Sequence, residues 1–122
     1  MRFTQDQSSN VNVIRGYGPG ELRINDQMYA SSVIVAASSI RSEPAVADVA
    51  DLAAEHVTRV LEFEPELVLV GTGRRQVFPS AAFGAQFLKA GIGFEVMDTG
   101  AACRTFNVLV SEHRRVVALL IV

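Results

Sequence analysis

Cysteine and histidine are scarce in this sequence, which has one cysteine, Cys103, and two histidines, His56 and His113. A single cysteine excludes an internal disulfide framework and a metal site built from several thiolates, and it is typical of proteins in a reducing compartment. The two histidines are far apart in the sequence and do not form a ligand spacing such as HxxxH. We therefore expect neither a metal nor any other cofactor.

A strong excess of either charge is also missing. The chain has 11 basic and 13 acidic side chains, which gives a formal net charge of −2. A protein with this balance does not attract nucleic acid through its overall field, although basic side chains can still gather locally. We expect no nucleic-acid partner.

Targeting and membrane-spanning segments are not visible either. The start of the chain, MRFTQDQSSN, is polar and lacks both the apolar core of a signal peptide and the arginine-rich pattern of a transit peptide. The apolar segment from Val116 to Val122 is far shorter than the roughly 20 residues that a membrane span requires. We expect a cytoplasmic protein without membrane insertion, and we interpret this last segment as a buried strand.

The length and composition predict one globular domain. The chain has 122 residues, of which 49% are hydrophobic and 20% are charged. A chain of this size buries roughly two thirds of its unfolded surface around a single core. We predict a flexible N-terminus at residues 1–10, followed by a single α/β domain at residues 11–122.

The first third of the sequence has the signals of β-strands. β-branched residues are frequent from Val11 to Ala37, and turn signals occur at Gly18 to Gly20 and at Asn25-Asp26. A two-residue Asn-Asp loop tolerates positive φ and is typical of a hairpin. The pattern predicts three strands in this region.

A helix is predicted next, beginning at a position between Ala45 and Leu52. Asp48 and Asp51 are both suitable N-caps, so the start is not fixed more closely. Its apolar side has helical spacing and consists of Val46, Val49, Ala50, Ala53, Val57, Val60 and Leu61.

The second half alternates between apolar strands and helices. Such alternation indicates parallel strands joined by helical crossovers, with helices on both faces of the sheet. With the antiparallel N-terminal hairpin region added, it predicts a three-layer α/β sandwich with a mixed, largely parallel sheet. The predicted elements are a strand at 67–71, a helix from Pro79 to Gly91, a strand at 93–97, a helix from Asp98 or Thr99 to about Glu112, and a strand at 115–122.

Two of these strands end in polar loops, the first of them in the sequence GTGRR. Parallel neighbours bring their carboxyl ends to one edge of the sheet, where ligands of open α/β sheets bind. Glycines permit close backbone approach, and arginines bind carboxylates and phosphates in a forked geometry. A tight turn with solvated arginines is the alternative, because GTG lacks the third glycine of a dinucleotide fingerprint and the GK[ST] of a P-loop. The candidate anion or partner site consists of Gly71, Thr72, Gly73, Arg74, Asp98, Thr99 and Arg104.

No catalytic residue is predicted. Cys103 lies near the first turn of its helix, where a thiol pKa falls if solvent reaches it, but it adjoins the apolar face, so we expect a buried, inert thiol. Glu95 and Asp98 would suit acid and base roles, but structural roles are favoured. Capping and packing are the expected roles of His56 and His113.

Phe78 precedes the proline that opens a predicted helix. It would serve either as a hydrophobic staple or as an exposed contact for a partner, and the staple is the commoner arrangement.

Several segments together resemble a known family. The segments ELVLVGTG, FP, GIGFEVMDTGAACRTFNVL and RRVVALL resemble a small domain-of-unknown-function family that includes complex I assembly factor 3 and many bacterial and archaeal proteins. The similarity extends from about Tyr17 to Val122. The resemblance implies a three-layer α/β fold with a mixed sheet and a non-catalytic assembly or interaction module, whose protein partner would be a membrane complex under assembly. The alternative is a small-molecule anion-binding protein or enzyme with its site at the corner formed by residues 71–73 and 98–104.

Overall fold

The computed structural model describes residues 11–122, so the segment 1–10, which we predict to be flexible, lies outside the described residues. The described chain forms two β-sheets and three α-helices. The strands are β1 (Ile14–Gly18), β2 (Glu21–Ile24), β3 (Gln27–Tyr29), β4 (Val33–Ala36), β5 (Ser39–Ser42), β6 (Leu67–Gly71), β7 (Gly93–Met97) and β8 (Val116–Leu120). The helices are the 3-10 turn η1 (Val49–Asp51), α2 (Ala54–Leu61), α3 (Ala81–Lys89) and α4 (Thr99–Ser111).

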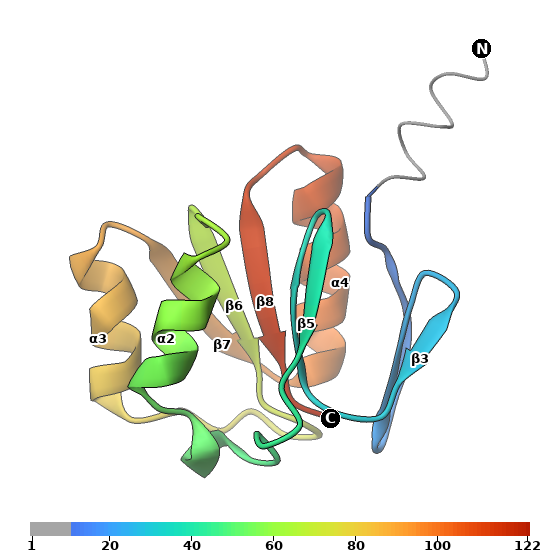
Figure 1. Ribbon diagram of the computed structural model, residues 1–122, viewed down its shortest axis with the longest axis horizontal. Helices are drawn as coiled ribbons and strands as arrows, with labels where there is room; N and C mark the ends of the chain where they lie inside the picture. The colour runs from blue at the N-terminus through green and yellow to red at the C-terminus, as the bar shows by residue number, and fades with distance from the viewer. Residues whose placement is uncertain (1–10) are drawn as a thin grey trace.

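The larger sheet has five strands in the order β5-β4-β8-β6-β7 (Figure 1). β8 pairs in parallel with β6, and β6 pairs in parallel with β7. On its other side β8 pairs antiparallel with β4, which is joined to β5 by a hairpin. Every residue of β8 is buried, so the apolar segment that ends the sequence is a central strand of the sheet.

Side chains from alternate positions fill two separate cores. One core contains Leu69, Ala118 and Phe106, and it lies between the sheet, α4 and the smaller sheet. The other contains Val68, Leu119 and Phe87, and it lies between the sheet, α2 and α3. Burying a side chain of this size contributes about 1.5–3 kcal/mol. The predicted three-layer α/β fold is therefore confirmed (Figure 1).

The smaller sheet consists of β1, β2 and β3 and is entirely antiparallel. The predicted hairpin at Asn25-Asp26 joins β2 to β3, and Asn25 has the positive φ of 54° that this tight turn requires. The number of strands was underestimated, because four strands lie between Val11 and Ala37, and β5 follows them. The reason is Ser31-Ser32, which separates β3 from β4 and turns the chain from one sheet to the other.

The two helices of the second half begin and end close to the predicted residues. α4 begins at Thr99, and the Asp98 carboxylate accepts a hydrogen bond of 2.9 Å from the Ala101 N–H. α3 begins at Ala81, two residues after Pro79, and the chain leaves it at Gly91, where φ is 78°.

The predicted start of α2 is wrong, because the helix begins at Ala54, beyond the predicted limit of Leu52. Asp48 and Asp51 are both used, but they cap the 3-10 turn η1 that precedes the helix. The first turn of α2 is instead stabilised by His56, whose Nδ1 accepts a hydrogen bond of 3.0 Å from the Ala53 N–H.

Candidate functional site

The carboxyl ends of the three parallel strands are joined by one hydroxyl group. Thr99 Oγ1 accepts a hydrogen bond of 2.7 Å from the Gly73 N–H and donates one of 2.7 Å to the Ile121 carbonyl. The Thr99 N–H in turn donates to the Gly73 carbonyl at 2.9 Å. Thr99 is fully buried, so these bonds form a rigid floor beneath the loops that follow the strands.

The polar groups of the loop after β6 form hydrogen bonds within the loop and to the end of β7. The Thr72 N–H donates to the Met97 carbonyl at 2.9 Å, and Thr72 Oγ1 donates to the Arg75 carbonyl at 2.6 Å while accepting from the Val77 N–H at 3.0 Å. A Cβ on Gly71 would lie 2.9 Å from the Thr99 Cα, so the glycine permits close packing of β6 against α4. The N–H groups of Thr72 and Gly73 are therefore already engaged and do not point at a ligand.

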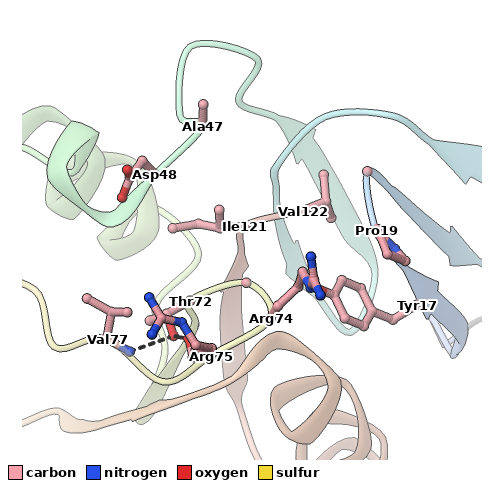
Figure 2. Close-up of a pocket in the computed structure, with 12 residues that line it drawn as sticks. Tyr17, Pro19, Ala47, Asp48, Thr72, Arg74, Arg75, Val77, Ile121 and Val122 are labelled. Atoms are coloured by element: carbon pink, nitrogen blue, oxygen red, sulfur yellow. Dashed lines mark hydrogen bonds between the residues drawn. The ribbon is translucent and has the colours of Figure 1, made fainter.

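A hollow of about 360 Å³ lies above this floor (Figure 2). Arg74 extends toward Tyr17 of β1, and Arg75 lies beside Thr72, while Asp48 approaches from the opposite wall (Figure 2). The hollow combines two guanidinium groups with a phenol at the carboxyl end of the parallel strands, where bound ligands are expected in this class of fold.

Tyr17 also lines two neighbouring hollows. One, of about 250 Å³, lies between β1 and α4 and includes Cys103 and Arg104. The other, of about 330 Å³, lies along β1 and β2 and includes Arg23 and Met28, and Arg15 lines both of these hollows. We name this region the arginine surface, and its members are Arg15, Tyr17, Arg23, Arg74, Arg75 and Arg104.

The arginine surface carries unneutralised charge. Its five arginines are all exposed, and none lies within ion-pair distance of a carboxylate in residues 11–122. The acidic side chains Glu21 and Asp48 line two of the hollows without reaching a guanidinium at that distance. The surface is thus locally basic on a chain whose net charge is negative.

Burial raises the pKa of two titratable groups in this region. Burial above all raises the pKa of Tyr17 above its ordinary value of 10.0, and the Arg74 guanidinium acts in the opposite direction. Burial also raises the pKa of Cys103 to about 11, against a smaller opposing effect of Arg104. At neutral pH the phenol is protonated and the thiol is not a thiolate, so Cys103 is a poor nucleophile, as its place on the apolar helix face predicts.

The seven residues proposed from the sequence all lie near the same end of the sheet, but in different roles. Thr72, Gly73 and Arg74 line the largest hollow. Gly71 and Thr99 are packed beneath it, Asp98 caps α4, and Arg104 lines the adjacent hollow on the other side of Tyr17.

Tyr17, Arg15 and Arg23 are the members of the arginine surface that the sequence analysis missed. They lie on a hairpin 48 to 56 residues before Gly71, and only the folding of β1 against α4 brings them to the GTG loop. Their sequence contains no motif that indicates this position.

The other residues considered for acid, base or metal-binding roles lie outside the three hollows. Glu95 is exposed on the edge strand β7. His56 is buried, and its Nε2 lies 3.9 Å from Glu43 Oε1. His113 is exposed, with a φ of 63°, just after α4. In the described part of the chain, no group of three or more His, Cys, Asp or Glu side chains could hold a metal ion.

The predicted staple role of Phe78 is wrong. The N-cap of α3 is Ser80, so the staple position belongs to Pro79, and Phe78 is 72% exposed. Phe78 and the exposed Leu88 border an apolar groove of about 240 Å³ over α3 and the edge strand β7.

Within residues 11–122, none of the helices is both long enough and apolar enough to cross a membrane.

The arrangement described above defines a three-layer α/β protein with a mixed five-stranded sheet, with polar hollows at the carboxyl ends of its parallel strands. A protein of Bordetella parapertussis has the same fold in its crystal structure, with a TM-score of 0.84 and 36% sequence identity over 91% of this chain and 95% of that one. The chain belongs to the family described as a protein of unknown function (DUF498/DUF598), whose model matches residues 14–121.

Relatives of the chain have names of two kinds. A zebrafish protein named NADH dehydrogenase [ubiquinone] 1 alpha subcomplex assembly factor 3 is 34% identical over 123 residues, which cover 99% of this chain and 70% of that protein. A protein of Francisella tularensis named 13 kDa major membrane protein is 30% identical over 106 residues, which cover 86% of each chain. The family therefore includes a relative of this chain that is named as an assembly factor.

Proposed function

We propose that the chain is a non-catalytic interaction module that binds a protein partner while a larger complex is assembled. The observation that supports this most is the arginine surface, where five exposed guanidinium groups meet around Tyr17 without carboxylate partners among residues 11–122. Arginine and tyrosine are the residue types most enriched at the energetic centres of protein interfaces. The name of the zebrafish relative points the same way.

The polar groups around the hollows support a role in binding over one in catalysis. The hydroxyls of Thr72 and Thr99 are engaged in hydrogen bonds to the backbone, and the Cys103 thiol is buried with a raised pKa. A nucleophile needs a base within hydrogen-bond reach to be activated, and neither histidine lines these hollows.

The finer form of the proposal is that the partner is an NADH dehydrogenase complex under assembly, approached from the cytoplasm by a protein that does not insert into the membrane. The test is to delete the gene in the source cell and to separate membrane complexes on native gels, together with fractionation of a tagged chain. We expect less assembled NADH dehydrogenase, and comigration of the tagged chain with a smaller intermediate.

Re-expression of the wild-type chain is the control, and it should restore the assembled enzyme. Normal assembly in the deletion strain would contradict the NADH dehydrogenase role. If the tagged chain migrates as a free protein under all growth conditions, the proposal that it is an interaction module would be contradicted.

A small-anion site at the corner of residues 71–73 and 98–104 is the second candidate. It is favoured by the hollow of about 360 Å³ with Arg74 and Arg75 in its wall. The N–H groups of Thr72 and Gly73 are engaged and so do not contribute donors, and an affinity in the millimolar to micromolar range, about −4 to −8 kcal/mol, is the most that we expect. Titration with phosphate, sulfate and nucleotides tests this, and amide shifts that stay unchanged at residues 71–75 and 98–104 would exclude it.

A further inference from the structure

We propose that the arginine surface binds an acidic, extended segment of the partner protein, with aspartate and glutamate carboxylates on the guanidinium groups and Tyr17 at the centre. This inference rests on the proposed function and specifies the chemistry of the partner.

The shape favours a chain over a compact ligand. The three hollows are open and adjoin one another around the edge strand β1, because all three include Tyr17 and two of them share Arg15. Arg23 and Met28 lie on the outer face of the smaller sheet, opposite to the face of Tyr17. A small anion in the largest hollow would reach Arg74 and Arg75 and leave Arg104 and Arg23 in other hollows. An extended peptide advances about 3.3 Å per residue and can place a side chain in each hollow in turn.

The chemistry of arginine matches that of carboxylates. A guanidinium presents its N–H groups as a planar fork that binds a carboxylate through two parallel hydrogen bonds. In the same chain, arginines already bind glutamates, each through a single hydrogen bond, with nitrogen to oxygen distances of 2.6 Å from Arg59 to Glu43 and 2.8 Å from Arg114 to Glu66. The five arginines around Tyr17 lack such carboxylates within residues 11–122, so a partner can supply them.

The same surface is poorly suited to phosphate groups. Phosphate sites in proteins are commonly formed by free backbone N–H groups, and those of Thr72 and Gly73 already donate to Met97 and Thr99. A nucleic acid carries a charge at every phosphate, and Glu21 and Asp48 in the walls would repel part of it. A peptide can place neutral or basic side chains opposite these two carboxylates.

Tyr17 provides the apolar contact that such an interface needs at its centre, and Met28 adds a second one on the outer face of the smaller sheet. Met28 is 52% exposed and lines the same hollow as Arg23 and Tyr17. Tyrosine buries an apolar ring and keeps a hydroxyl for a hydrogen bond. Charged contacts at the rim and an aromatic side chain at the centre are the usual anatomy of a protein interface.

The experiment uses the full chain and a fluorescent peptide of about 12 residues in which glutamate alternates with serine, a pattern that suits an extended conformation. Binding is measured by fluorescence anisotropy at low and at physiological salt. We expect saturable binding that weakens with salt, and a loss of about tenfold or more in the double variant R74Q/R104Q, because both guanidinium groups contact carboxylates.

The matched control is the double variant R114Q/R115Q, which removes the same charge from the two arginines that contact Glu66. It should bind the acidic peptide within about twofold of the wild type, since it lies outside the arginine surface. A second control is the peptide with glutamine in place of glutamate, which should not bind. Circular dichroism of both variants shows whether they are folded.

Three results would overturn the inference. The first is that no binding occurs at millimolar peptide, and the second is that both double variants lose affinity equally. The third is that inorganic phosphate, phosphatidylglycerol vesicles or an RNA oligonucleotide binds the same arginines more tightly and displaces the peptide, which would assign the surface to that ligand.

The outcome is separable from that of the proposed function. If the tagged chain comigrates with a cellular complex and R74Q/R104Q does so equally well, only the arginine surface is excluded as the docking site. If the wild-type chain has no cellular partner, the interaction module is excluded whatever the peptide does.

Discussion

The nine arginines in the described part of the chain fall into two groups that differ in their neighbours. Arg41, Arg59, Arg114 and Arg115 lie within ion-pair distance of glutamates. The five arginines of the arginine surface have no such partner among residues 11–122. The two groups show how one residue type can either join parts of a fold or remain available to another molecule.

The paired arginines connect elements that are distant in the sequence. Arg59 of α2 and Arg41 of β5 both contact Glu43, whose side chain is only 4% exposed. Arg114 and Arg115 contact Glu66 at the amino ends of β6 and β8. Each glutamate therefore contacts two guanidinium groups and joins two elements of the larger sheet or its helices.

The unpaired arginines have the opposite thermodynamic effect. Like charges close together disfavour the folded state, and partly exposed guanidinium groups form no ion pair that would offset this repulsion. Retaining five of them around one tyrosine costs stability, which is typical of a surface selected for binding.

The largest expected change in the free energy of unfolding follows from the loss of the Glu43 carboxylate, the more buried of the two. Glu43→Gln removes the charge that Arg41 and Arg59 share, and with it the charged hydrogen bond from Arg59, a kind of bond that contributes about 1.5–3 kcal/mol. Both arginines are partly exposed, so we expect the free energy of unfolding to fall by about 2–3 kcal/mol in total. Urea unfolding followed by circular dichroism measures it.

Glu21→Gln is the matched control, because Glu21 is an exposed carboxylate in a hollow of the arginine surface without an ion pair among residues 11–122. Its effect should stay within about 0.5 kcal/mol. Equal effects of the two substitutions would mean that the paired arginines do not stabilise the fold, and the comparison would fail.

A smaller effect is expected at Glu66, whose carboxylate is more exposed than that of Glu43. A hydrogen bond from the Arg115 N–H, followed by one from the Arg114 side chain, lowers the pKa of Glu66 below its ordinary value of 4.5. A carboxyl group with a lowered pKa in the folded state stabilises the fold above its unfolded pKa, and this contribution is lost as the pH falls through the folded pKa.

Glu66→Gln should therefore lower the urea midpoint modestly at pH 7, since exposed ion pairs are weak. The difference from the wild type should shrink as the pH is lowered through and below about 4.5. A difference that stays constant down to acid pH would show that side-chain packing, and not the charge of Glu66, is responsible.

The smallest effect is expected where arginines are unpaired. Replacing Arg74 and Arg104 with glutamine should raise the free energy of unfolding slightly, by no more than about 0.5 kcal/mol, because like-charge repulsion is removed. Arg59→Gln is the control, and it should be clearly destabilising because Glu43 loses its charged hydrogen bond from Arg59. A loss in the double variant as large as that in Arg59→Gln would reveal a structural role and would weaken the case for a docking surface.

Local sequence signals predicted the parts of the fold that local chemistry controls. Gly91 ends α3, Asp98 caps α4, and Asn25 forms the hairpin turn, each through a conformation or hydrogen bond within a few residues. The start of α2 was mispredicted because an aspartate caps a 3-10 turn and an α-helix equally well, and Asp48 caps the former. Which of the two forms depends on how Val46 and Val49 pack against the sheet.

Only the part of the candidate site that lies close together in the sequence was predicted. The loop after β6 could be located because a strand and a glycine pair are adjacent in the sequence. The division of the arginines into paired and unpaired groups could not be predicted. Glu43 and Arg59 are separated by 16 residues, and Glu66 and Arg114 are separated by 48. Pairing over such distances depends on tertiary structure, and so does the position of Tyr17.

The central position of β8 has a consequence for biosynthesis. β8 is synthesised last of the eight strands, yet it separates β4 from β6 and pairs with both. Translation of the 49 residues from Gly71 to Leu120 takes roughly 2 to 10 seconds at typical rates. Throughout that interval, β4 and β6 have unpaired apolar edges on the nascent chain, of the kind that aggregates or binds chaperones.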